Sequence, residues 1–175
     1  MTETSTFRGL VQQLYERDFP AAQSAWVEEF LVLMIELRST FGNDLDKIII
    51  LSMIGQQKLR DPSLPPMSHS DARQQPPRQE KVRGTNIDAL ARASRIPRES
   101  VRRKVNELIA DNLVERLDTG GIVIRTGAAA RLAPATMVTI AMLDAVISKY
   151  IGLLSDHGLI SPGIPTTGAH HNNGR

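Results

Sequence analysis

The chain has 175 residues, which is enough for one domain with its own hydrophobic core. It contains no cysteine, and this excludes disulfides, zinc sites with thiolate ligands and thiol catalysis. No uninterrupted apolar run approaches the roughly 18 residues that cross a bilayer. The N-terminus also lacks the basic start and apolar core of a signal peptide. We therefore expect a cytoplasmic protein without a membrane-spanning segment.

The net charge of +2 is unevenly distributed along the chain. Residues 57–104 hold twelve basic and five acidic residues, a net charge of +7, whereas residues 1–56 carry −4 and residues 105–175 carry −1. Such asymmetry is typical of a protein with a polyanionic partner, and it is equally typical of a basic flexible linker.

The N-terminal part predicts helices. Apolar residues recur at helical spacing over 6–18 and again over 21–38, and we assign residues 1–42 to supporting or dimerising helices. A third helix is expected over 44–59, capped by Asn43 or Asp44. Its length favours a helix over a strand at the isoleucine triplet 48–50.

Residues 61–85 hold five of the ten prolines and few large apolar residues, so we expect a mobile loop there. After it, Asn86 can cap a short helix, and "RIP" forms a tight turn. Pro97 suits the first position of a helix over 97–112, whose buried stripe begins at Val101.

The segment 114–125, "VERLDTGGIVIR", predicts a β-hairpin with a glycine-containing turn. A long helix is then expected to begin at Pro134 and to end near Leu154, with a heptad-like apolar seam. We assign residues 133–160 to dimerisation, because apolar residues cover more of this helix than one small domain can bury. Residues 161–175 are expected to be a disordered tail.

The helix over 97–112 carries groups that can read DNA bases on the face opposite its buried stripe. Arginine can bond guanine with two hydrogen bonds, glutamate can accept from cytosine, and asparagine can bond adenine. Two further sets of residues follow from the pattern. The residues placed to reach phosphates are Arg92, Arg95, Ser100, Arg102 and Lys104. The residues at the hairpin are Thr119, Gly120, Gly121 and Arg125.

The order of helix, turn, helix and hairpin over residues 86–126 resembles the winged helix-turn-helix of bacterial transcriptional regulators. "PRESVRR", residues 97–103, is similar to the recognition helix of the cyclic-AMP receptor protein family. The flanking helices look more like the MarR type. By this resemblance Arg98, Glu99 and Arg103 read bases, and the hairpin is the wing at the minor groove or backbone. Asn106 joins the base-reading residues because it lies on the helix face opposite the buried stripe.

The resemblance implies a mainly α fold with a small β-hairpin wing, in which residues 43–132 form the DNA-binding domain. It implies a homodimeric regulator that binds double-stranded DNA. Two features depart from the family pattern. Arg95 stands where the turn prefers glycine, and the loop 61–85 interrupts the motif. No nucleotide-binding domain is expected.

Other functions have less support in the sequence. A winged-helix module that binds protein in a chromosome-maintenance or replication complex is the alternative. No enzyme motif, cofactor motif or metal-ligand spacing is present, and "DTGG" is explained by the hairpin turn. A small-molecule effector is compatible with this class of regulator, but no residue pattern supports one.

Overall fold

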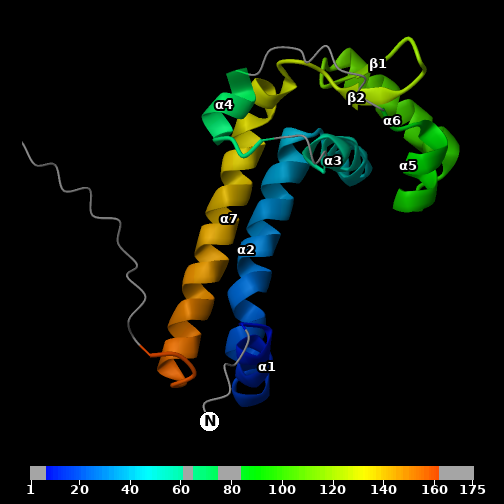
Figure 1. Cartoon of the computed structure of the whole chain (residues 1–175). Coiled ribbons are helices and arrows are strands. Elements are labelled where there is room, and N and C mark those ends of the chain that lie inside the picture. Colours follow the sequence, from blue (N-terminus) through cyan, green and yellow to red (C-terminus); the bar gives the residue numbers. More distant parts are fainter. Residues whose placement is uncertain (1–6, 61–64, 75–83, 162–175) are drawn as a thin grey trace, which may run out of the picture. The chain divides into compact units, whose positions relative to one another are not determined.

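The computed structural model describes residues 7–60, 65–74 and 84–161. Within these ranges the chain is mainly helical, with one small antiparallel sheet (Figure 1). The helices are α1 (Phe7–Arg17), α2 (Phe19–Thr40), α3 (Leu45–Leu59), α4 (His69–Gln74), α5 (Ile87–Ser94), α6 (Arg98–Ala110) and α7 (Ala128–Asp156). The strands are β1 (Val114–Arg116) and β2 (Ile122–Ile124). This confirms the expected mainly α fold with a small hairpin.

The chain divides into two compact units. One unit comprises residues 1–32 and 141–175, and the other comprises residues 33–140. Both dividing points lie inside helices, α2 and α7, whereas the sequence predicts boundaries at residues 42, 132 and 160. Composition alone does not reveal a division that runs through continuous helices.

In the first unit, the N-terminal part of α2 and the C-terminal part of α7 run side by side (Figure 1), and α1 packs with them. The buried side chains include Leu14 and Leu154. The hydroxyl groups of Tyr15 and Tyr150 lie 3.0 Å apart, and Tyr150 also donates to the Ala22 carbonyl at 2.9 Å. These contacts join the two ends of the chain within this unit.

In the second unit, α3, α5, α6 and the hairpin surround one apolar core. Its most deeply buried side chains include Ile50, Ile54, Leu90, Val101, Val105, Leu108, Val114 and Ile122. The buried residues of α6 recur every three or four positions, as expected for one helical face against a core. The predicted stripe that begins at Val101 is confirmed.

The helix caps follow the sequence closely. The Asp44 carboxylate accepts a hydrogen bond from the Lys47 backbone N–H at 3.0 Å, and the Asn86 side chain accepts from the Ala89 N–H at 2.8 Å. Each bond satisfies an N–H that lacks a partner in the first helical turn. Residues 48–50 are helical, as predicted.

The loop expected over 61–85 is partly ordered, which is a correction. His69–Gln74 forms α4, and Thr85 forms an isolated antiparallel bridge with Ile122. A single paired residue flanked by proline-rich and basic sequence carries no strand pattern, so the sequence did not indicate it. Residues 61–64 and 75–83 lie outside the described residues, as do residues 162–175 of the expected tail.

Two prolines occupy other positions than expected. Pro97 precedes α6 as its N-cap residue, so the helix starts at Arg98. Pro134 lies inside α7, which begins at Ala128 after Gly127 adopts a left-handed φ of 82°. The alanine-rich first turns favour the helix and help to offset the cost of the proline, which removes one backbone hydrogen bond and crowds the preceding turn.

Among the described residues, α7 is long and apolar enough to cross a membrane by length and composition. The expectation of no such segment came from uninterrupted apolar runs, and α7 mixes large apolar residues with alanine and threonine. Asp144 lies well inside the helix, where a carboxylate disfavours insertion by about 2.5–3.5 kcal/mol at a bilayer centre. A helix of a soluble protein meets the same criteria, so the finding alone assigns no membrane.

Candidate nucleic-acid interface

The turn between α5 and α6 consists of three residues, 95–97. Arg95 adopts the left-handed conformation, with φ 59° and ψ 18°, at the position where such a turn prefers glycine. The Ile96 N–H donates to the Ser94 hydroxyl at 3.2 Å, and the Ile96 side chain enters the core. A non-glycine residue in this conformation costs about 1–2 kcal/mol, which the buried Ile96 helps to offset. The turn therefore fixes how α6 leaves α5.

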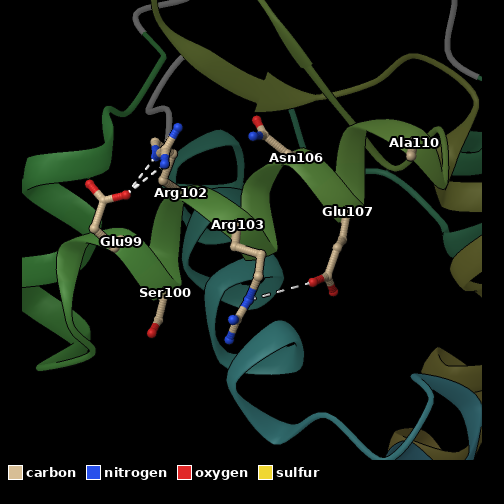
Figure 2. Close-up of a pocket in the computed structure, with 7 residues that line it drawn as sticks. All are labelled: Glu99, Ser100, Arg102, Arg103, Asn106, Glu107 and Ala110. Carbon is tan, nitrogen blue, oxygen red and sulfur yellow. Dashed lines mark hydrogen bonds and ion pairs between the residues drawn. The ribbon is translucent and has the colours of Figure 1, made fainter.

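The exposed face of α6 lies opposite its buried stripe. Figure 2 shows the polar side chains that project from this face and line a shallow hollow. The hollow is lined by Glu99, Ser100, Arg102, Arg103, Asn106, Glu107 and Ala110. Three of the four predicted base-reading residues, Glu99, Arg103 and Asn106, are thus brought together on one surface.

Arg98 is exposed but engaged with the preceding helix. Its Nε donates to the Asp88 carboxylate at 2.6 Å, and this hydrogen bond and the charge of Asp88 raise the pKa of Arg98. Glu99 lies 3.5 Å from the other side of the same guanidinium. Exposed pairs of this kind contribute little to stability, so Arg98 can exchange the carboxylate for another acceptor.

Glu99 and Arg102 form a second pair on this face, with 2.7 Å between the guanidinium and the carboxylate (Figure 2). Arg103 is the most exposed of the three arginines of α6, at 69% for its side chain, and its Nε lies 3.9 Å from Glu107. Since a 3.9 Å contact is beyond hydrogen-bond length, most donors of Arg103 face solvent.

Lys104 does not lie where the sequence placed it, and this is a correction. Its side chain is 13% exposed and points to the start of α3, where its ammonium bonds to Asp44 and lies 3.4 Å from Glu107. The hydrogen bond and charge of Asp44 raise the pKa of Lys104. An ammonium that is covered and paired with two carboxylates is not available to phosphate. The sequence pattern gave no sign of this pairing, because Asp44 lies far from Lys104 along the chain.

The other predicted phosphate-binding residues differ in exposure. Arg92 and Arg95 are exposed, and Ser100 is half-buried within the hollow. Arg116 on β1 was missed by the sequence reasoning. It is exposed, and its guanidinium donates to the Asn106 amide oxygen at 3.4 Å, so it adds a positive charge beside the α6 face. The only signal for it was a basic residue in a short predicted strand.

The hairpin has the predicted strands and turn. Val114 pairs with Ile124 and Arg116 with Ile122, while Thr119 and Gly120 are exposed at the turn. Gly120 has a φ of 81°, which favours glycine. Arg125 follows β2, is exposed, and donates to the Asn112 amide oxygen.

Gly121 lies against the backbone of residue 84 rather than at the tip. A Cβ on Gly121 would lie 3.0 Å from the Gly84 Cα, and a Cβ on Gly84 would lie 2.6 Å from the Ile122 nitrogen. The two glycines permit the bridge in which Thr85 and Ile122 exchange backbone hydrogen bonds of 3.0 and 2.7 Å. The segment before α5 is therefore hydrogen-bonded to the start of β2, next to the hairpin turn.

Among the described residues, no three histidine, aspartate or glutamate side chains gather in a group that could hold a metal ion. His170 and His171, whose spacing the sequence left unsupported as a metal site, lie outside the described residues.

Comparison of the chain with protein-family models, curated proteins and solved structures gave no match. A functional assignment therefore has to come from the residues and their geometry.

Proposed function

We propose that the chain is a sequence-specific, double-stranded DNA-binding protein of the winged helix-turn-helix type that acts as a homodimeric transcriptional regulator. In this proposal α6 enters the major groove, and the hairpin lies at the minor groove or the backbone. The observation that carries it is the exposed face of α6, where Glu99, Arg103 and Asn106 stand together beside the hairpin residue Arg116.

The order of elements supports the proposal. The chain runs from α3 through the Thr85 bridge, α5 and α6 to the hairpin, and all pack on one core. A helix buried on one side by such a core presents only its opposite side, and a major groove about 12 Å wide accepts it. Arg98 and Arg102 sit in the first two turns of α6, where they would reach phosphates or base edges first.

The electrostatics are compatible with DNA binding. Each arginine of α6 has a carboxylate partner, but these pairs are exposed and weak. A phosphate would replace the carboxylate beside Arg102, while Arg92, Arg95 and Arg125 would add backbone contacts and salt-dependent affinity.

Exposed apolar side chains on α7 support the homodimer. Ile140, Leu143 and Ile147 follow the heptad spacing of the predicted seam, and each is about half exposed. Large apolar residues that repeat at this spacing and face solvent are typical of a helix that pairs with another copy. A dimer would read two half-sites about 34 Å apart. We propose a cytoplasmic location, with no membrane and no catalytic activity.

The proposal is tested by selecting bound fragments from random genomic DNA and by measuring the affinity of the selected site. Arg103→Ala is expected to reduce the preference for one base pair by about 1–3 kcal/mol. Arg38→Ala, which removes an exposed arginine at the end of α2, serves as the control and should bind as the wild type does. Failure to select any fragment at low salt would contradict the proposal.

The alternative, a winged-helix module that binds protein, is favoured by the mixed charge of the same face. Asp88, Glu99 and Glu107 lie among the arginines, and a protein partner with both charges would complement them. A folded chain that binds no DNA at low salt would support this alternative.

A further inference from the structure

Glu107 stands between the exposed face of α6 and a set of charges fixed by α3. Its Oε1 lies 3.9 Å from the Arg103 Nε and 3.4 Å from the Lys104 ammonium. Its Oε2 lies 4.0 Å from the Lys47 ammonium. One carboxylate thus contacts an outward-facing arginine and two inward-facing lysines.

The two lysines are anchored on their other sides. Lys47, on α3, is 14% exposed and bonds to Asp111 at 2.5 Å, and Lys104 bonds to Asp44. Ammonium groups with so little access to water require carboxylate partners, because an unpaired covered charge is strongly unfavourable. The lysines and their carboxylates therefore hold Glu107 in place.

Glu99 provides a comparison on the same face. Its ion pairs are with Arg98 and Arg102, whose side chains are about 60% exposed like its own. No covered residue holds Glu99 within the described part of the chain. Of these two acids, Glu107 is therefore the one whose side chain is held by partly buried lysines.

An arginine side chain loses rotamer entropy when it is fixed in one geometry. A partly oriented Arg103 loses less of it on binding, and the carboxylate beside it disfavours approach to a phosphate. Both effects favour contact of the guanidinium with a neutral base edge over contact with a phosphate. Guanine offers two acceptors at such an edge.

We propose that Glu107 is a specificity-determining positioning residue, which orients Arg103 toward a base edge and is itself held by Lys47 and Lys104. This rests on the proposed DNA-binding function. Glu107 makes no base contact in this account, and it acts through Arg103.

The test compares Glu107→Gln with the wild type on the selected site and on a scrambled duplex. Loss of the negative charge should tighten binding to the scrambled duplex about threefold, as expected for one unit charge about 6 Å from a phosphate in water. Orientation of Arg103 is lost at the same time, so the ratio of specific to non-specific affinity should fall about fivefold or more. A purely structural role would weaken binding to both duplexes in parallel, and this result would overturn the proposal.

Three variants complete the design. Glu115→Gln removes an acid from β1, outside the α6 face, and should leave the preference unchanged. Glu107→Asp keeps the charge but withdraws the carboxylate from Arg103, so it should lower the preference without tightening non-specific binding. In an Arg103→Ala background, Glu107→Gln should change the preference no further.

The outcomes separate this inference from the function on which it rests. Absence of DNA binding by the wild-type protein would overturn the proposed function and the role of Glu107 with it. Selective binding by the wild type, with the same preference in Glu107→Gln or an additional loss in the double variant, would overturn only the role of Glu107.

Discussion

Replacement of Gly84 by alanine tests the close packing and the backbone hydrogen bonds between the segment before α5 and the hairpin. A Cβ at this position would lie 2.6 Å from the Ile122 nitrogen and 2.8 Å from both the carbonyl carbon and the Cα of Gly121. All three are backbone atoms, which cannot rotate away as a flexible side chain can. The segment around residue 84 must therefore move away from the start of β2, and the bridge between Thr85 and Ile122 must open.

The cost follows from what the bridge contains. Two backbone hydrogen bonds contribute about 1 kcal/mol each, and a buried group left without its partner costs about 1–3 kcal/mol. Ile122 is almost completely buried, so its N–H would lose its partner in an apolar setting. We expect Gly84→Ala to lower the free energy of unfolding by about 2–4 kcal/mol.

Urea unfolding followed by circular dichroism measures this effect. With a slope of about 2 kcal/mol/M, the midpoint should fall by about 1–2 M. Gly55, inside α3, gives the matched control in the same unit. A Cβ at this position would make only ordinary 4.0 Å contacts with the Ile124 side chain. Gly55→Ala should stabilise the helix by about 0.5–1 kcal/mol. A Gly84→Ala midpoint equal to that of the wild type would refute the close packing described here.

Three further predictions concern the turn, the α3 cap and the apolar surface of α7. Arg95→Gly should raise the melting temperature. Glycine relieves about 1–2 kcal/mol of left-handed strain, and this gain exceeds the about 0.5–1 kcal/mol that glycine costs through the greater entropy of the unfolded chain. An unchanged or lower melting temperature would contradict the strain. Partial burial would raise the pKa of Asp44, but its lysine partners outweigh this and hold the pKa below the usual value, so its contribution to stability is present at neutral pH and lost as the pH falls through the folded pKa. Asp44→Asn keeps the helix cap and should melt below the wild type at pH 7, and this difference should shrink as the pH falls below the usual pKa of an aspartate, whereas a constant difference across pH would exclude the charge as the cause. Leu143→Asp should convert a dimer to a monomer in light scattering, while Leu31→Asp, at a similarly exposed leucine of α2, should not; a dimeric Leu143→Asp would rule out this surface.

Much of the fold was predictable because local rules dominate it. The caps at Asp44 and Asn86, the left-handed Arg95 and the hairpin around Gly120 each depend on a few neighbouring residues. Helical spacing was also sufficient to separate the buried stripe of α6, beginning at Val101, from its exposed face.

The remaining features depend on contacts between residues far apart in sequence. Lys104 meets Asp44 across 60 positions, and Thr85 meets Ile122 across 37 positions, so neither pairing leaves a local pattern. The predicted start of the last helix at Pro134 was wrong for a different reason. Proline favours the first turn of a helix, but the alanine-rich sequence from Ala128 already favours the helix before it.

The affinity of the wild-type chain for its selected duplex, measured by fluorescence anisotropy over a range of salt concentrations, tests the central claim most directly. The account predicts saturable binding that is at least a thousandfold tighter than binding to a scrambled duplex, within the range of about 10³–10⁷ found for specific DNA-binding proteins. It also predicts that affinity falls steeply with salt, with a slope of about −0.9 for each phosphate contact. Equal affinity for the two duplexes, or no binding at about 50 mM salt, would contradict sequence-specific DNA recognition by the exposed face of α6.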